Sequence, residues 1–291
     1  MMSLLPRRLP RAAACLLAAF LVVLAARGWG ATTALLVASS LLMFGCCWAS
    51  AAHLLGAPAA WRLVAIATGV GWLAEQLGSS YGWFFGSYTY TPVLGPRLRD
   101  VPVVIPLMWF ALTYIGYVAA NLIVWQSPVD RPASVGHDAL LALLGAMVVT
   151  CYDLGVDPYM VYVLKAWIMT ETDGWWFGET VQGFAGWMGV AFVILFAFRR
   201  LAVVRPAAAV PPTLRHVLVP LSVYAGLMVF QVLLGHPVEA RTIALFAMGF
   251  PLLAAGIGLL RWQGILAQAP AAAAPAAGNE TVAFEPLKEA A

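Results

Sequence analysis

The chain has 291 residues, of which 63% are hydrophobic and only 10% are charged, and its mean hydropathy is +0.87. No soluble globular domain has this balance, and apolar stretches of about 20 residues recur along the chain. The composition therefore predicts an all-α fold, a polytopic membrane helix bundle. The net charge of +3 is small and the basic residues are scattered, which argues against nucleic acid as a partner.

Eight apolar runs predict eight transmembrane helices, at residues 12–26, 32–56, 61–77, 101–125, 138–157, 184–201, 214–235 and 240–262. The first run follows Arg7, Arg8 and Arg11 and resembles a signal peptide, but we interpret it as an uncleaved helix; cleavage would leave seven spans. Eleven of the sixteen basic residues fall on the side of the N-terminus, which predicts an N-in, C-in topology.

A single transmembrane domain is therefore expected over residues 1–264. Residues 265–291 are rich in alanine and proline, with polar residues near the end. This composition predicts a disordered cytoplasmic tail.

Cysteine and histidine give no sign of a metal or redox centre. The four cysteines lie in apolar runs without metal-ligand spacing, and we interpret them as small core residues. The four histidines are far apart in sequence, whereas membrane di-iron oxygenases need clustered histidines. The sequence also contains no dinucleotide fingerprint and no P-loop. We therefore expect neither a metal nor a cofactor.

Acidic residues stand near the ends of two apolar runs. Glu75 lies near the end of the third run, and Asp153 and Asp157 lie in the fifth, where a spacing of four places them on one face of a helix. In the predicted topology the loops that follow, 78–100 and 158–183, emerge on the same, non-cytoplasmic side. Ionisable residues inside a span are costly to bury, so we take these three carboxylates as candidate catalytic residues.

Two of these carboxylates have a clear structural alternative. A salt bridge to Arg97 or Arg99 would account for Glu75, and a helix-ending turn before proline would account for Asp157. Asp153 lies deeper in its apolar run, and there we favour a functional role.

Clustered carboxyls in an apolar wall tend to hold protons, because burial and mutual repulsion both disfavour the ionised forms. A protonated carboxyl can serve as a general acid, and aromatic faces can stabilise a developing cation. This combination suits protonation of an alkene and capture of the carbocation by water. The aromatic residues that we expect to contact the substrate are Tyr88, Tyr90, Trp109, Trp167, Trp175, Trp176 and Trp187. An aromatic belt at the headgroup level is the structural alternative for such rings.

Several short motifs between residues 60 and 190 resemble one known family, the integral-membrane carotenoid-biosynthesis proteins. That family includes the carotenoid 1,2-hydratases of bacteria and the bisanhydrobacterioruberin hydratases of haloarchaea. The matching motifs are Glu75-x-x-Gly78, Phe85-Gly86-x-Tyr88-x-Tyr90-Thr91, Leu94-Gly95-Pro96, Val101-Pro102, Ile105-Pro106-Leu107-x-Trp109 and Asp153-x-x-x-Asp157-Pro158.

The resemblance implies an enzyme that adds water to the terminal isoprenoid double bond of a linear carotenoid, without a cofactor, to give a tertiary alcohol. Glu75 or Asp153 would protonate the double bond, and Asp157 would hold its partner's proton or position the water. Expected partners are the carotenoid, the lipid bilayer and other enzymes of the pathway, in the cytoplasmic membrane of a bacterium or archaeon. A linear carotenoid is about as long as the hydrocarbon core is thick, roughly 30 Å, so its end would reach the helix ends.

Several positions depart from the family pattern. Tyr152 stands where a tryptophan is expected, and Thr180 and Gly183 replace the proline and asparagine of the pattern Gly-Ile-Pro-x-x-Asn-Phe-x-Gly-Trp. If that asparagine orients water or substrate in relatives, Gln182 or Glu179 would do so here.

Three other functions fit parts of the sequence. Asp153-x-x-x-Asp157 is compatible with a Mg²⁺–diphosphate site of a membrane prenyltransferase, although the second aspartate-rich cluster of such enzymes is missing. A carotenoid cyclase would share the acid and the cation but exclude water. A non-catalytic membrane subunit of the pathway would use the carboxylates structurally and the aromatic rings as a lipid belt.

Overall fold

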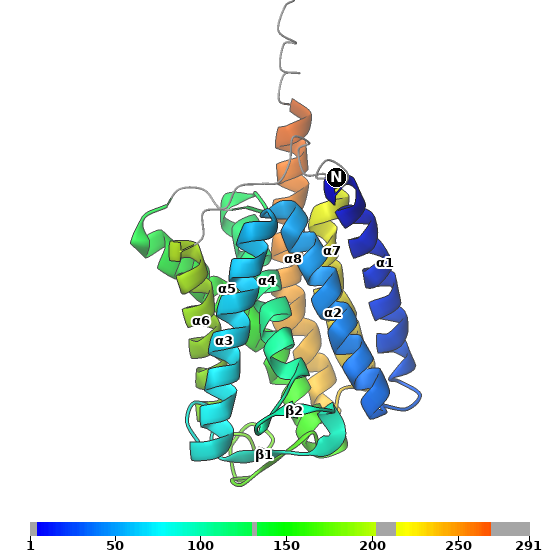
Figure 1. The fold of residues 1–291 in the computed structure, drawn as a ribbon, viewed down its shortest axis with the longest axis vertical. Coiled ribbons are helices and arrows are strands. Elements are labelled where there is room, and N and C mark those ends of the chain that lie inside the picture. The colour runs from blue at the N-terminus through cyan, green and yellow to red at the C-terminus, as the bar shows by residue number, and fades with distance from the viewer. Residues whose placement is uncertain (1–4, 130–132, 202–213, 269–291) are drawn as a thin grey trace, which may run out of the picture.

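The structure is a computed structural model that describes residues 5–129, 133–201 and 214–268, and it is a bundle of eight long helices (Figure 1). All eight of these helices are long and apolar enough to cross a membrane. They are α1 (Leu5–Ala26), α2 (Thr33–Leu54), α3 (Ala57–Tyr81), α4 (Val104–Trp125), α5 (Val135–Pro158), α6 (Val181–Leu201), α7 (Leu214–Leu234) and α8 (Glu239–Gln268). The predicted eight-span helical membrane bundle is confirmed, and its orientation stays a prediction.

Several helices begin or end at residues that satisfy the terminal backbone groups. The Thr32 and Ser134 hydroxyls accept hydrogen bonds from the first turns of α2 and α5. Helix α3 ends at Gly82, whose φ of 69° lies in the left-handed region that glycine tolerates best. The chain therefore leaves α3 in a sharp turn, which sends the following loop back over the end of the bundle.

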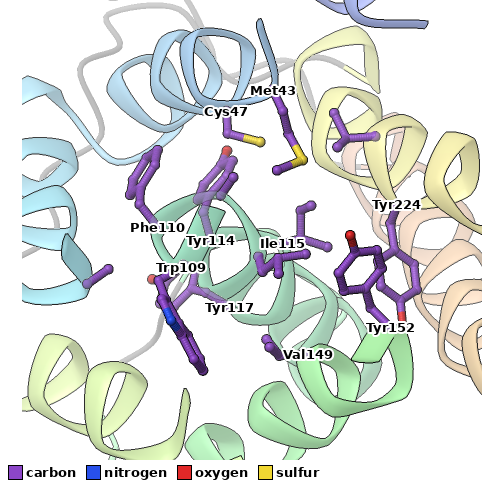
Figure 2. Packing of buried hydrophobic residues seen from close by; sticks show 14 of the residues in the cluster. Met43, Cys47, Trp109, Phe110, Tyr114, Ile115, Tyr117, Val149, Tyr152 and Tyr224 are labelled. Atoms are coloured by element: carbon purple, nitrogen blue, oxygen red, sulfur yellow. The ribbon is translucent and has the colours of Figure 1, made fainter. Parts of the chain in front are cut away.

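Helix α4 lies at the centre of the bundle and is almost entirely buried. Figure 2 shows its aromatic side chains Phe110, Tyr114 and Tyr117 packed among neighbouring helices. The Tyr114 hydroxyl lies 2.8 Å from Ser50 Oγ, so this polar group is paired within the core. The backbones of α4 and α5 approach closely, because a Cβ on Gly116 of α4 would lie only 2.6 Å from a carbonyl oxygen of α5.

Short strands join the loops 78–100 and 158–183, both rich in aromatic residues, into a cap over one end of the bundle (Figure 1). Strand β1 (Tyr88–Tyr90) pairs antiparallel with β4 (Trp167–Met169), and β2 (Arg97–Leu98) pairs with β3 (Val101–Pro102). The β1–β4 pairing brings the loop after α3 against the loop after α5. The prediction that these two loops lie on one side of the molecule is confirmed.

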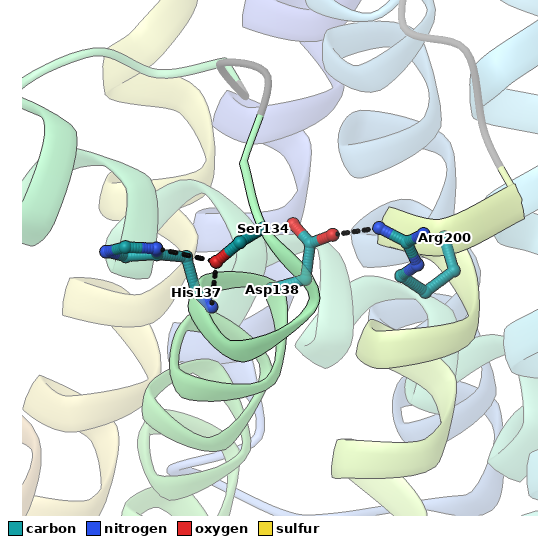
Figure 3. A network of polar contacts seen from close by, with 4 residues as sticks. All are labelled: Ser134, His137, Asp138 and Arg200. Atoms are coloured by element: carbon teal, nitrogen blue, oxygen red, sulfur yellow. Dashed lines mark hydrogen bonds and ion pairs between the residues drawn. The ribbon is translucent and has the colours of Figure 1, made fainter.

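At the end of α5 that lies away from the cap, polar side chains join this helix to α6 (Figure 3). Ser134 Oγ lies 2.9 Å from His137 Nδ1, and Arg200 of α6 donates a hydrogen bond of 2.8 Å to Asp138 Oδ2. This ion pair ties the start of α5 to the end of α6. This contact therefore holds α5 and α6 together at the end of the bundle that lies away from the cap.

Three predicted boundaries differ from the structure. Helix α3 continues to Tyr81, so Glu75 lies inside the helix rather than at its end. The chain remains helical through Pro158 into a π-helical turn, Tyr159–Val163, so Asp157 does not mark a helix end. Helix α8 runs on to Gln268, and the rest of the predicted tail lies outside the described residues.

Candidate functional site

A cavity lies at the capped end of the bundle, with walls from α3, α4, α5 and α6 and from strands β1 and β4. Its volume is about 60 Å³. This is room for several water molecules. Its lining residues are Glu75, Phe85, Tyr88, Tyr90, Ile105, Met108, Trp109, Tyr152, Val156, Asp157, Met160, Trp167, Met169, Glu179, Thr180, Gly183 and Trp187.

Glu75 is buried on α3 and accepts three hydrogen bonds. The hydroxyls of Tyr88 and Tyr90 donate to Oε2 over 2.6 and 2.7 Å, and Trp109 Nε1 donates to Oε1 over 2.9 Å. Burial and the neighbouring Glu75 charge raise the pKa of both tyrosine hydroxyls well above the usual value, so both remain proton donors. Arg97, a predicted salt-bridge partner of Glu75, instead donates to the Tyr90 carbonyl.

Asp157 and Glu179 place a pair of neighbouring carboxyl groups in the same cavity. Asp157 comes from α5 and Glu179 from the loop before α6, and their side chains are hydrogen-bonded to each other. Burial, followed by the Asp157 charge and this hydrogen bond, raises the pKa of Glu179 to about 12. Two carboxyl groups can share a hydrogen bond only when at least one is protonated, so this pair holds a proton.

Asp153 lies one helical turn before Asp157 and is only 1% exposed. Both of its carboxyl oxygens are buried without a hydrogen-bond partner among the described residues. It does not line the cavity, although its charge interacts with Asp157 and Glu75. The structure thus brings Glu75 and Asp157 to the cavity wall and leaves Asp153 behind it.

Five of the seven predicted aromatic contacts line the cavity: Tyr88, Tyr90, Trp109, Trp167 and Trp187. The Trp109 and Trp187 rings pack with centroids 4.5 Å apart, and the Tyr90 and Trp167 rings meet edge to face at 5.9 Å.

Two of the predicted aromatic contacts do not line the cavity. Trp175 is 71% exposed, as expected for a ring in the interfacial belt. Trp176 instead donates its Nε1 hydrogen to the Leu154 carbonyl over 3.1 Å and packs against Phe177 and Phe184.

Three of the positions that depart from the family pattern lie at the cavity. Tyr152, Thr180 and Gly183 are lining residues. Of the two substitutes considered for the missing asparagine, Glu179 faces the cavity, whereas Gln182 donates to the Gly82 carbonyl outside it. The sequence names Glu179 only as a substitute for that asparagine, and the available signal was that an acidic residue stands at the isoleucine position of the family pattern.

The described residues contain two further features of interest. A groove of about 620 Å³ between α1 and α7 is lined almost entirely by apolar residues. His53 Nε2 lies 3.2 Å from His216 Nδ1, a contact that their separation in sequence does not reveal. Across the described ranges, no group of three or more histidine, cysteine, aspartate or glutamate side chains is arranged to hold a metal ion.

Comparison with known proteins places this geometry in context. A family model described as "Carotenoid biosynthesis protein" matches residues 14–254. The bisanhydrobacterioruberin hydratase of Haloarcula japonica is 34% identical over 127 residues, which cover 43% of this chain and 40% of that protein. The match thus spans less than half the length of that relative, and no solved structure matches. Because the family model covers most of the sequence, the chain belongs to the carotenoid biosynthesis protein family.

Proposed function

We propose that this protein is a carotenoid hydratase, which adds water across the terminal carbon–carbon double bond of a linear carotenoid to form a tertiary alcohol. Family membership supports a role in carotenoid biosynthesis, and a relative named as a hydratase supports the type of reaction. The cavity carries the proposal furthest, because it joins carboxyl groups, aromatic faces and space for water in an apolar wall.

The proposed reaction has three steps, which are proton transfer, stabilisation of the carbocation and capture of this cation by water. A carboxyl group donates its proton to the terminal double bond, and the π electrons form the new carbon–hydrogen bond. The resulting tertiary cation lies against electron-rich ring faces such as those of Trp109 and Trp187. Water then forms a carbon–oxygen bond and loses a proton to a carboxylate, so the sum is the addition of one water with no redox change.

Glu75 is better suited to organise the cavity than to supply the proton. Three donors converge on its carboxyl group, and the Trp109 indole N–H can only donate. These contacts hold the carboxyl group of Glu75 in one orientation. In this proposal Glu75 fixes β1 and the Trp109 ring in place around the substrate end group.

The membrane setting accounts for the position of the cavity at one end of the bundle. The long apolar part of a carotenoid can lie along the hydrocarbon core, whose thickness of roughly 30 Å matches its length. The reacting end then meets water and carboxyl groups at the helix ends. The exposed Trp175 and Tyr81 rings lie in the same capped region, where aromatic rings favour the interface.

Expression of the protein alone in a lycopene-producing bacterial host tests the proposal. The expected result is a carotenoid heavier by one or two molecules of water, with tertiary hydroxyl groups. A cyclised product of unchanged mass would indicate a cyclase instead. Unchanged lycopene in cells that contain the folded protein, together with no conversion of other linear carotenoids, would contradict a catalytic role and favour a non-catalytic subunit.

A further inference from the structure

The loop before α6 has a backbone that is built to hold Glu179 in one place. Gly174 and Gly178 exchange two backbone hydrogen bonds, of 3.1 and 2.9 Å, and the Glu179 N–H donates to the Trp176 carbonyl over 2.9 Å. A Cβ on Gly174 would collide with the Glu179 carbonyl, and Gly178 has a φ of 89°. Only glycine suits both positions, so the loop has the form of a tight, specific turn.

This loop is also fastened to the helix that carries Asp157. Trp176 Nε1 donates to the Leu154 carbonyl of α5, and the Tyr162 hydroxyl, from the turn after α5, donates to the Phe177 carbonyl. These two bonds lie on either side of Asp157 in the sequence. They hold the loop that carries Glu179 against the part of the chain that carries Asp157.

The Glu179 side chain is well placed for proton transfer into the cavity. Glu179 is only 3% exposed, and its Oε1 has no hydrogen-bond partner among the described residues. Its side chain is hydrogen-bonded to Asp157, and both residues line the cavity. A buried carboxyl oxygen without a partner is costly, and a water or substrate in the cavity would relieve that cost.

We propose that Glu179 and Asp157 act together as the proton-donating pair of the hydration reaction, an assignment that rests on the function proposed above. One proton is shared between the two carboxyls before reaction. When it passes to the double bond, the pair becomes doubly ionised beside the new carbocation, and these opposite charges attract. The proton released by the added water then returns to the pair, so one turnover restores the starting state.

The other two carboxyl groups fit this step less well. Glu75 is occupied by two tyrosine hydroxyls and one indole, and Asp153 does not line the cavity. Neither one is hydrogen-bonded to a second carboxyl. The Asp157–Glu179 pair alone combines cavity access with a shared proton among the described residues.

Glu179→Gln and Asp157→Asn test the assignment, since each keeps the side-chain size and removes one acid. Once the wild type has been shown to hydrate a linear carotenoid, each variant should lose at least about 100-fold in rate. Glu171 and Asp173 are exposed residues of the same loop region, so Glu171→Gln and Asp173→Asn are matched controls that should stay near the wild-type rate. Inactivity of the wild type would count against the proposed function itself. A fully active Glu179→Gln protein would overturn only the assignment of Asp157 and Glu179 as the proton-donating pair.

Infrared spectroscopy gives a second readout that does not depend on turnover. The wild type at neutral pH should show carbonyl stretches of buried protonated carboxylic acids, shifted in heavy water, and Glu179→Gln should lack one of the bands that the wild type shows. If Glu179→Gln does not accumulate as a folded protein, Asp157→Asn is measured in its place. A wild-type protein without any such band, or identical carboxylic-acid bands in the wild type and in the measured variant, would overturn the proton-sharing pair.

Discussion

The Tyr88 hydroxyl donates a hydrogen bond of 2.6 Å to Glu75 Oε2, and this bond connects the cap to the interior of α3. Gly78, one turn after Glu75, makes the contact possible, because a Cβ there would lie 3.0 Å from the Tyr88 hydroxyl oxygen. The cap is therefore fixed by a buried polar group of α3 as well as by its short strands.

Tyr88→Phe should destabilise the protein by about 1–3 kcal/mol, because it removes a donor from a buried carboxyl group. Tyr81→Phe is the matched control, since Tyr81 is 70% exposed and should tolerate the change. Thermal unfolding of both variants in detergent measures the difference. Equal midpoints for Tyr88→Phe and the wild type would mean that the bond does not stabilise the cap.

The fit between α3 and α4 predicts a second pair of variants. A Cβ on Gly71 would lie 2.6 Å from the Trp109 ring, whereas nothing lies within 4 Å of one on Gly69. Gly71→Ala should therefore cost about 1–3 kcal/mol of stability through overpacking and should displace the Trp109 indole from Glu75. Gly69→Ala should be neutral or stabilising by up to about 1 kcal/mol. Denaturation in mixed micelles measures the stability of both variants. Equal stabilities of Gly71→Ala and Gly69→Ala would contradict the close packing of Gly71 against Trp109.

The cavity wall on α6 predicts a steric block. Gly183 lines the cavity, and a Cβ there has ordinary space, 3.8 Å from the nearest described atom. Gly183→Leu should place its branched end in the cavity and lower the hydration rate about 10-fold or more without unfolding the protein. Gly189→Leu on the same helix has open space and should remain active. Similar product yields from both variants would show that the substrate does not use this cavity.

The buried Glu179 predicts a pH dependence of stability. Its pKa is raised in the folded protein, so the folded state binds more protons than the unfolded state at neutral and mildly alkaline pH. Its contribution is present at low pH and is lost as pH rises, by up to about 1.4 kcal/mol per pH unit. From about pH 6 to about pH 9, Glu179→Gln should thus lose less stability than the wild type, whereas Glu171→Gln should follow the wild type. Parallel curves for all three proteins would contradict the assignment.

Hydropathy and charge were sufficient to predict the architecture. The length and spacing of the apolar runs gave the eight spans, because a helix that crosses the bilayer needs a minimum apolar length. The cost of burying a carboxylate singled out Glu75, Asp153 and Asp157, and the structure buries all three. Pairing of β1 with β4 confirms that the two aromatic loops meet.

The finer features of the site depend on contacts that the local sequence does not encode. Glu179 reaches Asp157 through an irregular loop, and no periodicity reports where such a loop points its side chains. The Tyr88 hydroxyl binds Glu75, although an aromatic residue near a helix end equally predicts a belt position. Asp153 and Asp157 share a helix face, yet of these two only Asp157 lines the cavity.

The most direct test of the hydratase proposal is conversion of a linear carotenoid by the purified protein in heavy-oxygen water and, separately, in deuterated water. The proposal predicts a tertiary hydroxyl that carries solvent oxygen and a neighbouring carbon that carries one solvent hydrogen. Incorporation of solvent hydrogen without oxygen, in a product of cyclised skeleton, would contradict hydration. So would the absence of any product from a folded preparation supplied with lycopene and other linear carotenoids.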